Sequence, residues 1–365
     1  MNWENGVRKV IPYVPGEQPL NGDVIKLNTN ECPYPPAPGV KKKAAAFSSD
    51  QLRLYPDPDA SELTDALAEY YHVSSEQVFV GVGSDDVLSM SFLTFFNTGK
   101  PILFPDITYS FYDVWADLYR IPYQILPLDA DLRIRPEDYM IPNGGVVIAN
   151  PNAPTGLMAP VSEIEAIIRA NQDVVVIVDE AYVDFGGESV LPLLKKYENL
   201  LVVQTFSKSR AMAGMRIGFA IGNRKLIRYL KDAKFSFNSY TMNRPSLEMG
   251  IEAVKDDAYF TEICRRIVDT RERVKEELVQ LGFHFPESSA NFLFASHESV
   301  PAKNLFEALK ENGIFVRYFN KPRIDNYLRI TIGTDQQMDQ LITFLKTYLS
   351  EYAQRKAKES KHVEL

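Results

Sequence analysis

Short apolar runs alternate with stretches of helical periodicity through the first two thirds of the chain. Continuous apolar runs rich in β-branched residues are typical of strands that are buried on both faces, as in a parallel sheet. The helical stretches between the runs therefore predict an α/β domain, in which helices flank a mostly parallel central sheet. The runs lie at residues 78–82, 101–104, 146–149, 174–178, 200–203 and 217–221.

Helical spacing is clear at residues 59–71, where Leu63, Leu67 and Tyr70 recur on one face. We expect Asp59 to cap the start of this helix, because a short acidic side chain there can accept a hydrogen bond from a free backbone N–H.

The pattern changes after about residue 245, where a helix-rich region precedes short apolar strands and a final helix at about 335–352. We therefore expect a smaller α+β domain at 246–365, following a large domain at 40–245. The first 39 residues are rich in proline, glycine and asparagine, which predicts an N-terminal arm at 1–39 with little regular structure. We expect the arm to pack with the small domain or with a partner subunit.

Composition narrows the class of protein. The net charge of −8 argues against a nucleic-acid partner, since phosphate binding needs a basic face. No apolar run has the length of a membrane span, and the first residues lack an apolar signal core. The two cysteines, Cys32 and Cys264, fit no disulfide or metal pattern, so we expect a cytoplasmic protein without a metal site.

Lys208 lies between Ser207 and Ser209, and Arg216 follows eight positions later. A lysine that forms an imine needs small neighbours that admit a carbonyl cofactor. Hydroxyl groups and an arginine nearby suit an anionic group on that cofactor. A lysine in a polar loop is more often an ordinary surface residue, so the interpretation depends on the residues that accompany it.

A glycine turn at residues 81–86 follows an apolar run and opens a helical stretch. Such a turn offers free N–H groups and a helix dipole to an anion, here at Ser84 and Asp85. It resembles a dinucleotide-binding turn but lacks the third glycine. A tight strand–helix turn with Ser84 as its cap is an equally good interpretation.

Other polar side chains follow predicted strand ends, where α/β proteins bind ligands. Asp179 ends an apolar strand, and a carboxylate there is costly to bury unpaired. A pyridinium N–H would pair it, and Tyr182 and Asn152 could each reach a phenol oxygen on the same ring. Tyr109 could stack on that ring. Considered singly, these residues could equally be a helix cap, a turn and core aromatics.

Arg317 and Arg329 each lie on a short apolar strand in the second domain. Either arginine could bind an anionic substrate group where the domains meet. An arginine on a strand that points to solvent is an equally good interpretation.

With these residues in view, the chain resembles the fold-type I aminotransferases that depend on pyridoxal phosphate (PLP), and more narrowly their histidinol-phosphate aminotransferase branch. The resemblance covers nearly the whole length. It rests on motifs at residues 27–31, 53–56, 83–86, 105–109, 151–156, 179–182, 205–208, 214–218 and 328–333.

The resemblance implies roles around the cofactor ring. Lys208 would form the covalent link to PLP, and Asp179 would pair with the ring nitrogen. Tyr182 would contact the phenol oxygen, and Tyr109 would stack on the ring.

It also implies how the cofactor phosphate is held. The backbone at Ser84 and Asp85 would bind it, together with Ser207 and Arg216. Tyr55 would reach the phosphate of the neighbouring subunit's cofactor, which implies a homodimer.

One position departs from the family pattern. Family members usually have asparagine directly before the Pro-Thr-Gly of this motif, and here that residue is Ala153. Either Asn152 reaches the phenol oxygen from one position earlier, or Tyr182 acts there alone.

The function expected from the resemblance is transamination of histidinol phosphate with 2-oxoglutarate, in histidine biosynthesis. An aromatic-amino-acid aminotransferase or a phosphothreonine decarboxylase of the same fold is the alternative. The residues expected to bind the substrate are Tyr13, Asn30, Arg317 and Arg329.

Overall fold

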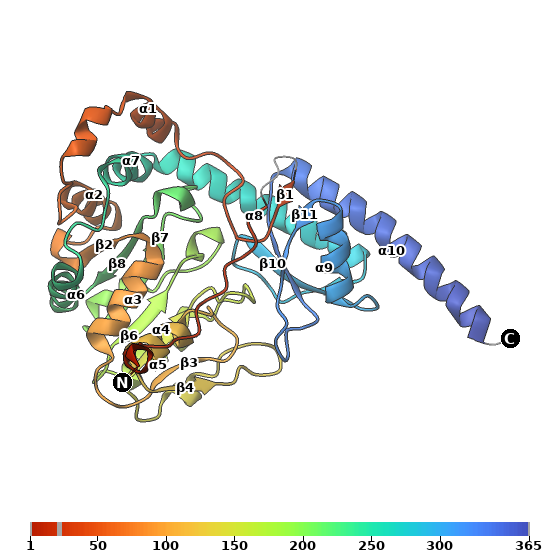
Figure 1. The fold of residues 1–365 in the computed structure, drawn as a ribbon, viewed down its shortest axis with the longest axis horizontal. Helices are drawn as coiled ribbons and strands as arrows, with labels where there is room; N and C mark the ends of the chain where they lie inside the picture. The colour runs from red at the N-terminus through yellow and green to blue at the C-terminus, as the bar shows by residue number, and fades with distance from the viewer. Residues whose placement is uncertain (1, 20–23, 364–365) are drawn as a thin grey trace.

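The computed structural model describes residues 2–19 and 24–363, with side chains up to residue 358. Two lobes make up the molecule (Figure 1). The large lobe is built on a seven-stranded sheet, and the small lobe on a four-stranded sheet. The predicted arm contributes β1 (Ile25–Lys26), which pairs in parallel with β11 (Ile314–Phe315) of the small lobe.

The seven-stranded sheet has the order β2-β8-β7-β6-β5-β3-β4. Six of its strands run parallel, and β8 runs antiparallel to both of its neighbours. This confirms the predicted α/β class with a mostly parallel sheet. In sheet order the strands are β2 (Val78–Gly81), β8 (Gly218–Gly222), β7 (Leu200–Thr205), β6 (Val176–Asp179), β5 (Gly145–Ala149), β3 (Ile102–Pro105) and β4 (Tyr123–Leu126).

Helices cover both faces of this sheet, which explains the continuous apolar runs. In β6, for example, Ile177 packs in one apolar cluster while Val176 and Val178 pack in another on the opposite face. The first face carries α3 (Gly83–Phe95), α4 (Tyr112–Tyr119) and α6 (Arg224–Phe237); the other carries α2 (Ser61–Tyr71), α5 (Val161–Ala170) and α7 (Arg244–Lys255). Strand β4 was not predicted, because it lies at the sheet edge with Ile125 exposed.

The helix predicted at 59–71 forms as α2, but its expected cap is wrong. Ala60 occupies the N-cap position, and the Asp57 carboxylate accepts hydrogen bonds from the backbone N–H groups of Asp59 (3.0 Å) and Ser61 (2.7 Å). The predicted helical region at 246–281 is two helices, because the Asp256 carboxylate accepts a bond from the Tyr259 N–H and caps a new helix there.

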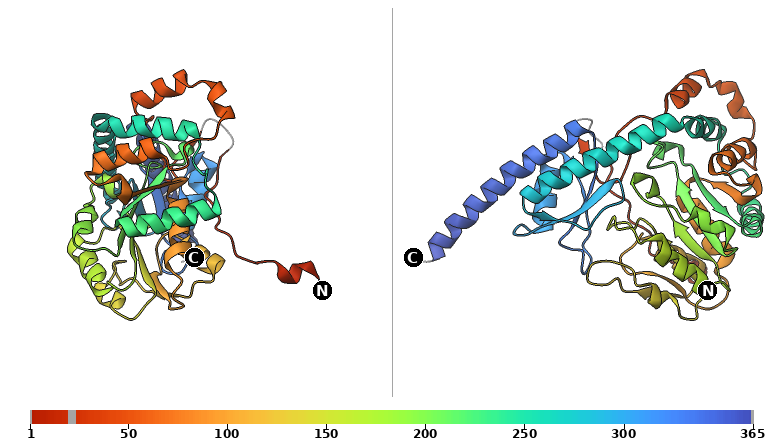
Figure 2. Two further views of the ribbon diagram at one scale, coloured as in Figure 1. Left: turned by 90° about the vertical axis from the view of Figure 1, so that its left-hand side faces the viewer. Right: turned by 180° about the vertical axis from the view of Figure 1, so that it is seen from behind.

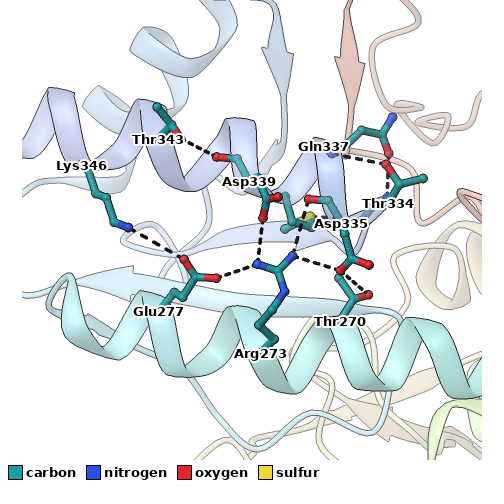
Figure 3. Close-up of polar contacts among 11 residues, drawn as sticks. Thr270, Arg273, Glu277, Thr334, Asp335, Gln337, Asp339, Thr343 and Lys346 are labelled. Atoms are coloured by element: carbon teal, nitrogen blue, oxygen red, sulfur yellow. Dashed lines mark hydrogen bonds and ion pairs between the residues drawn. The ribbon is translucent and has the colours of Figure 1, made fainter.

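Besides β11, the small lobe contains α8 (Asp257–Gln280), α9 (Ala302–Glu311), α10 (Asp335–Val363) and the strands of its four-stranded sheet, β9 (Phe283–His284), β10 (Phe292–His297), β12 (Arg317–Tyr318) and β13 (Leu328–Thr331). Helix α10 runs beyond the predicted end at 352 and projects from the body (Figure 1). Arg273 fastens α8 to α10 through ion pairs with Asp335 and Asp339, as Figure 3 shows.

The domain boundary at residue 245 stays a prediction. Helix α7 packs against α1 (Pro38–Ala46) and α2 of the large lobe, and Leu247 shares an apolar cluster with Leu63. The N-terminal end of the arm projects from the rest of the molecule (Figure 2). The Arg8 guanidinium of the arm donates to the Leu118 carbonyl of α4. In the described part of the chain, no helix is both long and apolar enough to cross a membrane.

Candidate active site

A cleft of about 460 Å³ lies at the carboxyl ends of β6 and β7. The arm, the large lobe and the small lobe all contribute to its lining. The sheet therefore brings together side chains that lie far apart in sequence, as expected for an open α/β fold. The predicted site residues that line the cleft are Tyr13, Asn30, Ser84, Asp85, Tyr109, Asp179, Tyr182, Ser207, Lys208, Arg216, Arg317 and Arg329.

Lys208 follows β7, and its amine points into the cleft. Nζ donates a hydrogen bond to the Thr29 carbonyl (3.1 Å) and lies 5.8 Å from the centroid of the Tyr182 ring. Two neighbours anchor the loop: Ser209 Oγ donates to the Asp184 carboxylate, and the Arg210 guanidinium donates to the Ala253 carbonyl (2.7 Å). The loop is thus fixed on the sheet side while the amine faces the cavity.

Asp179 ends β6 with 5% of its surface exposed. The Tyr112 hydroxyl donates to its Oδ2 (3.0 Å), and the Ala181 N–H donates to its Oδ1 (3.1 Å). Burial raises the pKa of this carboxyl to about 6, even though both hydrogen bonds act in the opposite direction. A cationic N–H in the cleft would offset the cost of ionising it, which fits the ring nitrogen of PLP.

Tyr182 lies beside Lys208 in the cleft, with its ring edge-on to Phe292 at 5.1 Å between centroids. Its hydroxyl accepts a hydrogen bond from Asn30 Nδ2 (2.9 Å). Tyr109 also lines the cleft, and its hydroxyl donates to Asp85 Oδ1 (2.7 Å). The structure thus brings both predicted tyrosines to the wall of the cleft.

The glycine turn forms a cup at the N-terminus of α3. Gly83 has a φ of +82°, and a Cβ built there would lie 2.9 Å from Arg216 Cζ, inside contact distance. A Cβ at Gly218 would overlap the Ser84 nitrogen. Only glycine permits this close approach, so free backbone N–H groups and a guanidinium converge where a phosphate would bind.

Arg216 extends over this cup and forms an ion pair with Asp85 at 3.1 Å between Nη2 and Oδ2. Both side chains are partly exposed to the cleft. The Ser207 N–H is bound to Thr205 Oγ1 (3.1 Å), and Ser207 lines the same side of the cavity. A hydroxyl, a guanidinium and a helix N-terminus on one wall fit the phosphate of PLP.

Arg317 and Arg329 lie directly opposite each other on the paired strands β12 and β13. Like charges in such cross-strand positions repel each other, and an anion bound between them would relieve that repulsion. Arg329 donates to the Asn28 carbonyl (3.0 Å), while its buried Nε has no hydrogen-bond partner among the described residues. Burial lowers the pKa of Arg329. The pair is thus poised to bind a phosphate or carboxylate.

Asn152 does not line the cleft, so the structure does not support its predicted contact with the cofactor. Its Nδ2 donates to the Ile107 carbonyl (2.9 Å) and to Thr155 Oγ1 (3.0 Å), and its Oδ1 accepts from Thr108 Oγ1 (2.9 Å). These bonds hold the loop after β5 against the loop after β3. Ala153 lines the cleft at this point instead.

Tyr55 also lies away from the cleft. Its side chain is 78% exposed, and its ring lies 4.6 Å from that of Tyr240. Its predicted contact is with a neighbouring subunit, so that role stays a prediction.

The sequence reasoning missed two residues that support the site. Tyr112 binds Asp179, and Thr331 binds Asn30 through its hydroxyl (3.0 Å). Tyr112 could have been suspected from its place three residues after Tyr109. Thr331 belongs to the motif at 328–333, but no local signal marks its hydroxyl as part of the site. No group of three or more metal-ligating side chains occurs within residues 2–19 and 24–358.

The sequence model of the family "Aminotransferase class I and II" matches residues 22–345. The chain belongs to this aminotransferase family. Among curated proteins, this aminotransferase is 53% identical over 349 residues to the histidinol-phosphate aminotransferase of Lactococcus lactis subsp. cremoris (strain MG1363), covering 96% of this chain and 98% of the relative. It is 50% identical to the histidinol-phosphate aminotransferase of Brachyspira hyodysenteriae, covering 93% and 96%.

Solved structures of more distant proteins share the fold. The aminotransferase aligns with histidinol-phosphate aminotransferase from Sinorhizobium meliloti, in complex with pyridoxal-5'-phosphate, with a TM-score of 0.82 at 23% identity, over 90% of this chain and 91% of that one. L-threonine-O-3-phosphate decarboxylase from Porphyromonas gingivalis aligns with a TM-score of 0.76 at 21% identity, over 90% and 100%. At these identities the fold alone is shared, and it does not separate the candidate reactions.

Proposed function

We propose that the chain catalyses the PLP-dependent transamination of histidinol phosphate with 2-oxoglutarate, in histidine biosynthesis. The observation that carries the proposal is the opposed pair Arg317 and Arg329, which faces the same cleft as Lys208 and Asp179. The curated relatives at 50–53% identity support the same reaction. The cofactor prediction is confirmed by membership of the aminotransferase family.

The residues present fit PLP. When bound, PLP supplies a carbonyl for the lysine and an electron sink for the bond broken at the substrate Cα. Asp179 would hold the ring nitrogen protonated, because a cationic N–H would stabilise its buried carboxylate. Ser84, Ser207 and Arg216 hold the phosphate.

Lys208 performs the proton transfer. With PLP and substrate bound, its Nζ would act as the general base toward the proton on the substrate Cα and as the general acid that returns one. The structure supports this role because the anchored loop holds Nζ in the cleft, where it donates to the Thr29 carbonyl and lies over the Tyr182 ring.

Arg317 and Arg329 serve both half-reactions. The donor brings a phosphate and the acceptor brings a carboxylate, and each anion forms bidentate contacts with guanidinium groups. The unpartnered Nε of Arg329 offers one such donor. Tyr13 and Asn30 line the cleft near these strands and complete the proposed substrate site.

A homodimer is part of the proposal. Tyr55 is exposed beside Tyr240, and its proposed partner is the cofactor phosphate of the neighbouring subunit. Leu52 and Leu54, which precede Tyr55 in the sequence, are also exposed. We also propose a cytoplasmic location, since both cysteines are free thiols and suit a reducing compartment.

A half-reaction experiment tests the function. The PLP-loaded protein is mixed in turn with histidinol phosphate, phenylalanine and aspartate, and conversion of the cofactor to its amine form is followed by absorbance. Fast conversion by histidinol phosphate alone is expected. Fast conversion by phenylalanine alone would instead assign the chain to aromatic amino-acid transamination, and release of carbon dioxide would indicate a decarboxylase.

The variant Lys208→Ala tests the catalytic assignment. It should lose turnover, because the group that moves the Cα proton is gone. Lys196→Ala is the matched control, since Lys196 is an exposed lysine paired with Glu165. Substantial turnover by Lys208→Ala would rule out the mechanism.

A further inference from the structure

Residues 27–31 form a strap that crosses the cleft and binds both lobes. Asn28 accepts from Arg329 of the small lobe, and Thr29 accepts from Lys208 of the large lobe. Asn30, the next residue of the strap, has 1% of its surface exposed and a φ of +57°. Its side chain joins Thr331 on β13 to Tyr182 beside the cofactor site.

The donors and acceptors in the hydrogen bonds among Asn30, Thr331 and Tyr182 indicate where the hydrogen atoms of these bonds lie. The backbone N–H of Asn30 donates to Thr331 Oγ1 (3.0 Å), so the hydroxyl hydrogen of Thr331 points elsewhere. Asn30 Oδ1 lies 3.0 Å from that hydroxyl and can only accept. The buried Thr331 hydroxyl donates to no other group among the described residues, so turning the amide over would leave its hydrogen unpaired. Thr331 therefore favours the orientation with Nδ2 toward Tyr182 (2.9 Å).

This orientation decides what the Tyr182 hydroxyl can do. It accepts from Asn30 Nδ2 and makes no second hydrogen bond within the described part of the chain. Its own hydrogen is therefore free to be donated into the cleft. Ala153, which also lines the cleft, has no side-chain group that could donate in its place.

We propose that Thr331 is a positioning residue that, by orienting the Asn30 amide, keeps the Tyr182 hydroxyl as a hydrogen-bond donor to the cofactor phenol oxygen. The inference rests on the proposed function, since it requires PLP in the cleft. It also links the small lobe to the cofactor, because Thr331 lies on β13, two residues after Arg329.

Removing the Thr331 hydroxyl should undo this orientation. The Asn30 amide can then turn over, and Oδ1 accepts the Tyr182 hydrogen in place of the cofactor oxygen. The charged phenol oxygen loses a donor, so the protonated form of the lysine–cofactor link persists to higher pH. A hydrogen bond to a charged group corresponds to a rise of roughly one pH unit in the midpoint of the cofactor absorption band.

The test is a spectrophotometric pH titration of the PLP-loaded protein without substrate. Thr331→Val removes the hydroxyl at nearly constant shape and should raise the midpoint by about one unit. Thr331→Ser keeps the hydroxyl and should titrate like the wild type. Thr270→Val is the matched control, because this buried threonine donates to Asp335 (3.0 Å) away from the cleft. It should leave the midpoint unchanged.

Two further variants keep the inference falsifiable. Asn30→Asp presents only acceptors to Tyr182 and adds a negative charge, so it should raise the midpoint even if Thr331→Val does not fold. The rise should be larger than in a Tyr182→Phe background, where the added charge alone acts. In a Tyr182→Phe background, Thr331→Val should add no further shift, because the two changes act through one hydroxyl. The groups that face Tyr182 are Lys208, Arg329, Tyr109 and Tyr112, and all of them stay in place in these variants; Asn30→Asp alone adds a charge.

The outcomes are distinct. A wild type that binds PLP, with Thr331→Val or Asn30→Asp titrating at the wild-type midpoint, overturns this inference and leaves the proposed function intact. A shift of equal size in the Tyr182→Phe background also overturns it. A wild type that forms no absorbing link with PLP overturns the proposed function itself.

Discussion

Replacing Gly83 with alanine should weaken cofactor binding far more than it weakens the fold. Gly83 has a φ of +82°, and its missing Cβ would lie 2.9 Å from Arg216 Cζ. Carbon atoms prefer a separation of about 3.5–4.0 Å, so Arg216 must move by about 1 Å. That movement takes the guanidinium away from the phosphate cup.

The magnitude follows from two contributions. A left-handed conformation costs alanine roughly 1–2 kcal/mol of folding stability. A hydrogen bond to a charged group contributes about 1.5–3 kcal/mol, so losing the Arg216 contact should weaken PLP binding by about 10- to 100-fold.

Gly99→Ala provides the matched control. Gly99 has a φ of +74°, but a Cβ there meets no atom within 4 Å. The two variants should therefore lose similar stability in thermal unfolding of the cofactor-free protein. Only Gly83→Ala should bind PLP more weakly when the cofactor is titrated against protein fluorescence. Equal PLP affinity in Gly83→Ala and Gly99→Ala would refute the assignment of this cup to the phosphate.

Three other changes give further tests. Burial raises the pKa of Glu180 to about 7, so the folded state binds this proton more tightly than the unfolded state does. The stability of the cofactor-free protein relative to Glu180→Gln should therefore fall as pH rises from about 4.5 to about 7. A constant difference in melting temperature across that range would contradict this. Arg323 joins the small lobe to Asp106 of the large lobe through an ion pair at 2.7 Å. Arg323→Met should raise KM for anionic substrates by about 10-fold with a smaller change in kcat, and Arg323→Lys should raise KM less. A fall in kcat alone in steady-state kinetics would argue against this role. If the proposed homodimer forms, Tyr55→Phe should weaken PLP binding without changing the sedimentation coefficient, whereas unchanged PLP affinity would exclude Tyr55 from the neighbouring site.

The sequence was sufficient for features that depend on short-range pattern. The apolar runs at 146–149, 174–178 and 200–203 became β5, β6 and β7, because strands buried on both faces leave no room for polar residues. Lys208 and Asp179 could be placed in one site, since both follow adjacent parallel strands whose carboxyl ends share an edge.

The tertiary structure decided where individual side chains point. Asn152 lies at the predicted strand end, yet the Ile107 carbonyl and Thr155 Oγ1 take both of its amide hydrogens. The carboxylate at the start of α2 is that of Asp57 and not that of Asp59, because the turn that orients such a carboxylate depends on the backbone around it. Local pattern indicates which residues lie near a site, but it does not determine which atoms a polar group meets there.

The remaining contacts of the site depend on how segments far apart in the sequence pair and pack. Arg317 and Arg329 face each other only because β12 and β13 pair in one register, and a shift by one residue would turn one of them away. Thr331 meets Asn30 across 301 positions of sequence, through the packing of β13 against the strap. Such contacts depend on how separate elements pack together, and no periodicity within either segment encodes them.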